Sequence, residues 1–379
     1  MAVKKICIVG LDDYAMLTGN TAFGLTGGES VQHILLAKAW RDLGLDVSII
    51  VHDHGQPRVT FIDGIRIVAA YAPKAGVFGL RFFHPRLTGV WGAMRQVDAD
   101  IYYQSPASSW AGLVALFAKT FNKQFILRIA SDSDCRRGQQ PMPYQRDRWM
   151  FDYGVMNASL IAAQTEQQQA LLTRNYSVNS EILNIAVEVP VSSGGKAKDV
   201  DVLWVGNFRR VKRPDLAVEL ARRLPQFRFA IVGGSAPGSE AYFDSIAAEA
   251  RELPNVIVTG ALPYRETGAW FDRARLHANT SDYEGFPNTF LQAWVRGVPV
   301  ASFFDPDRLI ERRVLGRRCT DVENMCVAID ELLRDANELA TMGERAREFV
   351  TQQYSARDIA QKYLDLLDGR DKALVCHNA

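Results

Sequence analysis

The stretch Thr280-Ser-Asp-Tyr-Glu-Gly-Phe-Pro-Asn-Thr-Phe-Leu-Gln-Ala-Trp294 is the part of this 379-residue chain that decides the fold. A short apolar run at 276–278 precedes it and predicts a strand, whereas 289–296 predicts a helix that stops at Gly297. Proline suits the first helical turn because its missing N–H would be unpaired there. A strand, a polar turn and a helix start together predict a phosphate site, because the N–H groups and the dipole of a helix start attract anions.

Glu284 is unexpected in such a turn, because a carboxylate is repelled by a bound phosphate. Its position makes sense if the carboxylate binds neutral hydroxyl groups beside the phosphate. A sugar attached to a phosphate presents hydroxyls in this way. The turn therefore predicts a sugar phosphate as the ligand.

The composition is that of an ordinary globular protein and excludes several classes. Lysine and arginine number 44 and aspartate and glutamate 43, so the net charge of +1 gives no basis for binding nucleic acid. The five cysteines are scattered without a C-x-x-C pair, which favours a reducing cytoplasm and disfavours disulfides and zinc. No apolar run reaches the roughly 18 residues of a membrane span.

Strands and helices alternate along the chain, and the pattern starts twice. A buried strand at 6–9, a glycine-rich loop and a helix at 29–43 open the first half, and a strand at 202–205 and a helix at 214–224 open the second. This alternation predicts α/β domains with parallel sheets. The composition of 187–199 is that of a linker. We therefore expect an N-terminal domain at 1–190 and a C-terminal domain at 191–351, with a helix at about 352–379 returning to the first.

The stretch at 280–294 also resembles the signature of the retaining GT-B glycosyltransferases of family four, in which two glutamates are separated by seven residues. Glu284 matches the first glutamate, and Gln292 stands at the second position. The resemblance implies two Rossmann-like domains whose parallel sheets face each other across a cleft. It also implies a nucleoside-diphosphate sugar as donor, transfer with retention of configuration, and no cofactor or essential metal.

A basic loop follows the strand at 202–205. Arg209, Arg210 and Lys212 lie just before a helix start, where they form either an anion clamp for a diphosphate or a solvated turn. Family members have Gly-Arg at this place and a lysine five residues after the arginine. Gly206 and Lys212 match, and Asn207 stands at the arginine position.

The expected site combines these residues with others that the resemblance suggests. The residues expected to take part in catalysis are Lys212, Arg209, Arg210 and Glu284. Those expected to bind the donor are Gly27, Gly28, Asn207, Gly233, Leu262, Gly285, Phe286, Pro287, Asn288, Thr289 and Gln292. Gly27-Gly28 and the glycine-rich turn at 233–234 have a simpler explanation as tight turns.

Two short motifs in the first half imitate metal sites. Asp132-Ser-Asp134 has the D-x-D form of another large transferase fold, and His52-Asp-His54 has two close histidines but no further ligand in view. We expect neither to bind a metal. Asp132 is instead a candidate for the acceptor side of the site.

The segment 81–96 combines basic and aromatic residues. It predicts a core-facing helix with a solvated face, and it also suits a peripheral contact with an anionic membrane surface. We therefore expect a cytoplasmic protein that can also bind peripherally to the inner face of the membrane.

The family resemblance favours a glycosyltransferase that uses a glycan, lipid-linked or small-molecule acceptor, in surface polysaccharide or glycoconjugate assembly. A non-catalytic sugar-nucleotide binding protein is the first alternative, because Asn207, Gln292 and Ala130 depart from the family pattern. A nicotinamide-dependent oxidoreductase is the second, but the chain lacks the G-x-G-x-x-G fingerprint.

Overall fold

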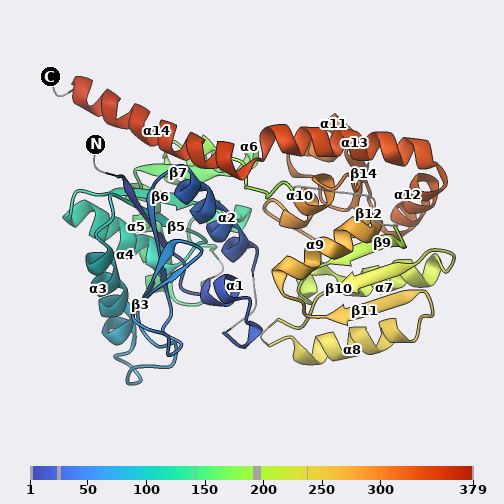
Figure 1. Ribbon diagram of the computed structural model, residues 1–379, viewed down its shortest axis with the longest axis horizontal. Helices are drawn as coiled ribbons and strands as arrows, with labels where there is room; N and C mark the ends of the chain where they lie inside the picture. Colours follow the sequence, from blue (N-terminus) through green and yellow to red (C-terminus); the bar gives the residue numbers. More distant parts are fainter. Residues whose placement is uncertain (1–2, 24–26, 141, 191–197, 237, 378–379) are drawn as a thin grey trace. The chain divides into compact units, whose positions relative to one another are not determined.

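The computed structural model describes residues 3–23, 27–140, 142–190, 198–236 and 238–377 (Figure 1). The chain divides into two compact units, the first containing 1–186 and 356–379 and the second 187–355. The expected boundaries at 190 and 351 lie within four residues of these divisions. Part of the expected linker, 191–197, lies outside the described residues.

Unit 1 is built on an eight-stranded sheet within the described residues, in the order β3-β4-β2-β1-β5-β6-β7-β8. Only β3 runs antiparallel among these strands, as the first arm of the hairpin β3–β4. The strands are β1 Lys5–Val9, β2 Asp46–Val51, β3 Val59–Ile62, β4 Ile65–Ala69, β5 Ile101–Gln104, β6 Gln124–Arg128, β7 Leu160–Ala163 and β8 Glu181–Ile182. The central strands are almost wholly buried, as expected for a parallel sheet with helices on both faces.

The helices of unit 1 come mainly from the crossovers between these strands. They are α1 Tyr14–Thr18, η1 Thr21–Phe23, α2 Gly28–Asp42, η2 Phe82–Leu87, α3 Thr88–Val97, α4 Ser109–Thr120, η3 Asp132–Cys135, α5 Gln145–Asn157, α6 Glu166–Tyr176 and α14 Ala356–His377. Helices α4 and α5 touch at their backbones: a Cβ on Gly112 would lie 2.3 Å from the Met150 carbonyl oxygen. A side chain at Gly112 would therefore force these two helices apart.

Helix α14 belongs to unit 1 although it lies last in the chain. The indole of Trp40 on α2 donates a hydrogen bond of 3.1 Å to the Ala360 carbonyl, and the Trp40 ring meets the Tyr363 ring edge-on at 5.8 Å. Trp40 and Tyr363 are fully buried, so α14 covers a face of unit 1 that would otherwise be apolar and exposed.

Unit 2 is built on a parallel six-stranded sheet, again within the described residues, in the order β11-β10-β9-β12-β13-β14. Its strands are β9 Val200–Val205, β10 Phe229–Val232, β11 Val256–Gly260, β12 Ala274–Asn279, β13 Val300–Ser302 and β14 Gly316–Arg318. Its helices are η4 Arg210–Lys212, α7 Pro214–Arg223, α8 Glu240–Arg251, α9 Tyr264–Arg273, α10 Asn288–Trp294, η5 Pro306–Arg308, α11 Leu309–Arg313, α12 Val322–Arg334 and α13 Ala336–Gln353. The strand order changes direction between β9 and β12, and ligands bind at such switch points, outside the carboxyl ends of the strands.

Three helix predictions need correction. The helix expected at 289–296 is α10, which begins one residue earlier, at Asn288, and ends at Trp294. The last helix, expected at about 352–379, begins later, at Ala356, and continues to His377. The segment 81–96 is two elements, η2 and α3, and only α3 follows the core-facing pattern, with Val90 and Met94 buried.

No helix among the described residues is both long enough and apolar enough to span a membrane.

Candidate functional site

The loops that follow β9 and β12 are joined at the carboxyl edge of the sheet of unit 2. The Thr280 hydroxyl lies 2.9 Å from the Lys212 carbonyl and 2.8 Å from that of Arg213, and it accepts a hydrogen bond of 2.9 Å from the Trp204 indole. The backbone N–H of Asp282 donates to the Val211 carbonyl at 2.9 Å. The basic loop is thus held against the turn that carries Glu284, at the switch point of the sheet.

Lys212 and Glu284 form an ion pair at this junction. The Ser281 hydroxyl donates a second hydrogen bond, of 2.7 Å, to the same carboxylate oxygen of Glu284. The side chain of Lys212 is 30% exposed and that of Glu284 12%, so the pair lies at the surface of the sheet edge with its cationic end outward. An incoming anion can therefore reach Lys212 without unfolding either loop.

The arginines of the basic loop have different surroundings. Arg213 is held by Asp215, at 2.9 Å, and lies 3.4 Å from Asp282. Arg209 and Arg210 are exposed, and the guanidinium of Arg210 lies 5.2 Å from the centre of the Tyr242 ring. Arg209 and Arg210 thus remain accessible to an anion, whereas Arg213 is already neutralised.

The loops after β9 and β10 approach so closely that they require glycine. Gly233 has φ +151°, and a Cβ there would lie 1.9 Å from the Gly206 carbonyl oxygen. The N–H of Phe208 donates to the Gly234 carbonyl at 2.9 Å. The close approach of the two loops therefore explains Gly233 without a ligand. Asn207 is half-buried and lies in the loop that follows β9.

Gln292 is buried in α10, and its side chain forms a hydrogen bond with the hydroxyl of Tyr264. Burial raises the pKa of Tyr264, and the bond to Gln292 opposes this rise. Tyr264 begins α9 just after Leu262, which is half-buried in the turn that follows β11. Two expected donor-binding residues, Leu262 and Gln292, are thus linked through a tyrosine that the sequence analysis missed.

The remaining expected residues of unit 2 lie in the turn between β12 and α10. Pro287 is buried, and the half-buried residues are Gly285, Phe286, Asn288 and Thr289. Behind the turn lies His277, whose pKa burial lowers to about 4, and its Nδ1 is 2.9 Å from the Leu203 carbonyl. His277 is therefore neutral at physiological pH and acts as part of the core.

In unit 1 the expected residues lie at the carboxyl edge of the other sheet. Gly27 caps α2, and Gly28 is its first residue. A Cβ on Gly27 would meet no atom within 4 Å, so packing among the described residues does not require glycine there. Close approach of a ligand stays a prediction for Gly27.

The first turn of α2 carries an acid that is paired with a buried arginine, and the sequence analysis missed it. Glu29 accepts a hydrogen bond of 2.5 Å from the Ser105 hydroxyl and pairs with Arg128 at 3.0 Å. The side chain of Arg128 is almost completely buried, whereas Glu29 reaches the surface. Glu29 comes directly after Gly27-Gly28. This proximity to expected donor-binding residues was the only signal in the sequence that could have placed Glu29 in the site.

The Asp132-Ser-Asp134 motif forms the turn of η3. The Asp134 carboxylate accepts hydrogen bonds from the N–H groups of Ala130 and Ser131, at 3.0 and 3.1 Å, which makes it a capping residue. Asp132 is more accessible; burial raises its pKa, and the neighbouring Gln168 amide opposes the rise. The structure thus separates the two carboxylates into a structural one and a candidate for binding.

Within the described residues, no group of three or more histidine, cysteine, aspartate or glutamate side chains is arranged to hold a metal ion. His52 and His54 take part in ring contacts with Tyr71 and Tyr14, respectively.

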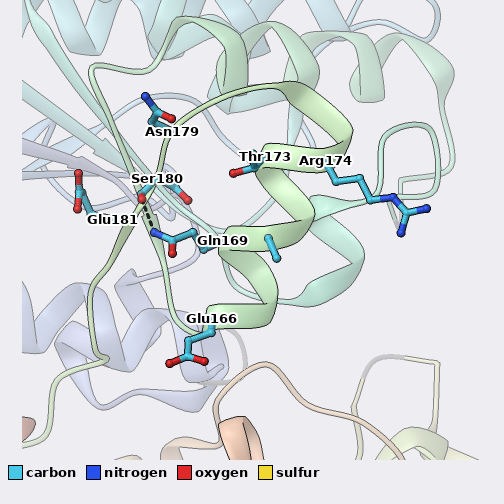
Figure 2. Close-up of a pocket in the computed structure, with 8 residues that line it drawn as sticks. Glu166, Gln169, Thr173, Arg174, Asn179, Ser180 and Glu181 are labelled. Atoms are coloured by element: carbon cyan, nitrogen blue, oxygen red, sulfur yellow. Dashed lines mark hydrogen bonds between the residues drawn. The ribbon is translucent and has the colours of Figure 1, made fainter.

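A hollow of about 830 Å³ lies beside α6 and contains none of the expected site residues. Figure 2 shows its lining, with Glu166 at one end, Arg174 at the other, and the amide of Gln169 hydrogen-bonded to the Ser180 carbonyl at 2.6 Å. It lies at the edge strand of the sheet of unit 1 and is open and polar. The candidate site is therefore defined by side-chain chemistry and not by the shape of a hollow.

Residues 199–335 match the family model described as glycosyl transferases group 1. A GDP-mannose-dependent alpha-(1-6)-phosphatidylinositol monomannoside mannosyltransferase of Mycolicibacterium smegmatis is 29% identical over 172 residues, which are 41% of this chain and 43% of that protein. The Vi polysaccharide biosynthesis protein VipC/TviE of Salmonella typhi is 33% identical over 113 residues, 28% of this chain and 19% of that protein. The matches thus span less than half the length of these curated relatives.

Solved structures resemble the chain over nearly its whole length. Sucrose-phosphate synthase from Thermosynechococcus elongatus has a TM-score of 0.77 at 19% identity, covering 98% of this chain and 100% of that one. HepE from Anabaena, in complex with UDP and glucose, has a TM-score of 0.75 at 15% identity, covering 96% and 99%. The chain therefore has the GT-B fold, which confirms the expected fold class. Within that fold, the match to the glycosyl transferases group 1 model covers most of unit 2.

Proposed function

We propose that this protein is a glycosyltransferase that moves a sugar from a nucleoside-diphosphate sugar to a glycan or lipid-linked acceptor, with retention of configuration. The observation that carries the proposal is the junction of Lys212 and Glu284 at the switch point of unit 2. A cation for phosphate and a carboxylate for hydroxyls are held together there, in the domain that matches the family model.

The chemistry that such a site must perform is limited, because a nucleoside diphosphate is already a good leaving group. As the bond to the sugar breaks, negative charge grows on the β-phosphate, and cations placed in advance stabilise that charge. Lys212, Arg209 and Arg210 are accessible for this role. Glu284 would orient the hydroxyls of the transferred sugar, and Gln292 with Tyr264 would hold the ribose.

The carboxyl edge of unit 1 is proposed to bind the acceptor. Gly27, Gly28 and Asp132 lie on loops at that edge, and Glu29 adds a fixed carboxylate. A carboxylate whose orientation is set by Arg128 can accept a hydrogen bond from an acceptor hydroxyl, and holding that hydroxyl in place lowers the barrier to attack.

We also propose that transfer needs no metal and takes place in the cytoplasm, in polysaccharide or glycoconjugate assembly. The basic loop supplies the positive charge that a metal would otherwise provide at the diphosphate. A relative with a polysaccharide-biosynthesis name and another named for a lipid acceptor support the setting.

The proposal is tested by a thermal-shift screen of UDP-, GDP- and ADP-sugars, followed by donor turnover with the sugar that binds. A ligand at 100 times its Kd stabilises the folded protein by about 2.7 kcal/mol, which gives a clear shift in Tm. Turnover should continue in EDTA. Binding without turnover or hydrolysis would establish the non-catalytic alternative, and a shift with NAD alone would establish the oxidoreductase.

Gln292 supplies a finer prediction about the departure from the family pattern. Gln292→Ala should weaken nucleotide binding by about 0.5–1.5 kcal/mol, the usual net contribution of one hydrogen bond. Tyr264→Phe, which removes the hydroxyl bonded to Gln292, should shift binding in the same direction. Gln292→Glu should keep activity within about tenfold, because it keeps the acceptor oxygen although it replaces the amide donor. The measurements are nucleotide titration and donor turnover, and activity confined to Gln292→Glu would contradict this role.

A further inference from the structure

Large apolar side chains are exposed on two segments of unit 1 that lie far apart in the sequence. In the first, Phe78 is 90% exposed, and Val77, Leu80 and Phe83 are also exposed. In the second, Trp149 is 66% exposed, and Tyr144 is exposed as well. Contiguous apolar surface of this kind marks a place where a protein meets another phase or partner.

The two segments meet at Arg146. The guanidinium of Arg146 lies 3.8 Å from the centre of the Phe82 ring and 4.8 Å from that of Tyr144. Trp149 follows Arg146 by one turn of α5, on a neighbouring position of the helix surface. The exposed side chains therefore form one surface, which we call the aromatic–basic patch: Val77, Phe78, Leu80, Phe83, Tyr144 and Trp149, with Lys74, Arg81 and Arg146.

The patch lies at the carboxyl edge of the sheet of unit 1. The first segment is in the connection that leaves β4, seen in Figure 1 as the loop leading to α3, and β4 runs parallel to β2. The second segment ends the connection that leaves β6, which also carries Asp132. The patch therefore shares an edge with the side chains proposed to bind the acceptor.

The two sequence segments that carry the patch are strongly one-sided in charge, although the whole chain is close to neutral at +1. Between residues 72 and 96 there are four lysine and arginine residues and no aspartate or glutamate. Between 136 and 149 there are four arginines and one acid, Asp147, which lies 3.3 Å from Arg146. A partner that complements this patch has an anionic surface layer over an apolar interior.

We propose that the aromatic–basic patch docks this protein on an anionic lipid bilayer. Aliphatic and phenylalanine side chains such as Leu80 and Phe78 enter the acyl region, while Tyr144 and Trp149 suit the interface and the arginines meet the lipid phosphates. A glycan would stack on the aromatic rings of the patch but would not use its exposed aliphatic side chains, Val77 and Leu80. The inference goes beyond the proposed function, because bilayer binding does not depend on glycosyl transfer.

The structure also changes which residues carry this contact. The sequence suggested the helix at 81–96 as the membrane element, but Val90 and Met94 of that segment are buried in unit 1. The exposed residues lie before it, at 77–83, and on α5. Docking is thus assigned to a loop and to the start of a helix, not to an amphipathic helix lying on the surface.

The test is sedimentation of the full chain with vesicles of phosphatidylglycerol and phosphatidylcholine in equal parts, beside vesicles of phosphatidylcholine alone. The protein should bind the anionic vesicles, and binding should weaken as NaCl is raised. The double variant Phe78→Ala/Leu80→Ala should lose about tenfold or more in the partition constant, because both side chains leave water on docking. Arg81→Glu should weaken binding to anionic vesicles without changing Tm.

Ile257→Ala is the matched control, because Ile257 is an exposed aliphatic residue on β11 of unit 2. It should bind vesicles like the original protein. Each variant is also assayed for donor hydrolysis, which should be unchanged by the patch substitutions. The proposal is overturned if anionic vesicles do not bind, if the double variant binds equally well, or if its main effect is to change the oligomeric mass or glycan binding.

Discussion

Replacing Lys212 with alanine is expected to lower donor turnover by about two to three orders of magnitude, the usual cost of removing one preorganised charge stabiliser. The side chain is paired with Glu284 in the unliganded protein and is accessible to a diphosphate. Its positive charge matters most when the leaving group gains negative charge, so kcat should fall more than nucleotide affinity. The measurement is steady-state turnover beside nucleotide titration.

Lys212→Arg is the control for this prediction, because it keeps the positive charge and should recover part of the rate. Thermal unfolding checks the fold, since Glu284 keeps its hydrogen bond from Ser281 when the lysine is removed. If Lys212→Ala turned over the donor as fast as the unsubstituted protein, the basic loop would be only solvated surface and the proposed donor site would be wrong.

Replacing Glu284 with alanine should lower kcat strongly while nucleotide binding survives. The carboxylate is proposed to bind hydroxyls of the transferred sugar, and such a contact is useful when it strengthens in the transition state. Removing its negative charge also frees Lys212 for the diphosphate, so affinity for the nucleotide alone should stay equal or rise. A variant that loses catalysis while keeping nucleotide affinity separates this role from a purely structural one.

Asp282→Asn is the matched control for Glu284. Asp282 lies two residues away in the same turn, is exposed and faces Arg213 at 3.4 Å. It should keep nearly full turnover. Equal loss in both variants would mean that the turn needs its charges for folding alone, whereas a silent Glu284→Ala would favour the non-catalytic alternative.

The sequence predicted the fold well because apolar runs and helical periodicity are local signals. The strands that start each unit, β1 and β9, stood out as apolar runs, and most of their residues are buried. Helix ends were harder to predict. Asn288 begins α10 within a turn that has no capping side chain, and the pattern alone could not fix where that helix starts or ends.

The site was only partly predictable, because contacts between distant residues leave little trace in one sequence. Lys212 and Glu284 entered the expected site through the chemistry of their turns together with the family resemblance, and the structure adds that they pair. The bond between Tyr264 and Gln292 had no such guide. The aromatic–basic patch depends on one contact, between Arg146 and Phe82, that no periodicity could indicate.

The return of α14 to unit 1 has a consequence for how the protein is made. A ribosome completes residues 187–355 before it releases α14, so unit 2 can fold first although it lies second in the chain. Until Ala360 and Tyr363 emerge, Trp40 lacks both its hydrogen-bond acceptor and its ring neighbour. During synthesis the apolar face of unit 1 around Trp40 therefore stays uncovered until α14 emerges. Chaperones would have their longest access to unit 1 at that face.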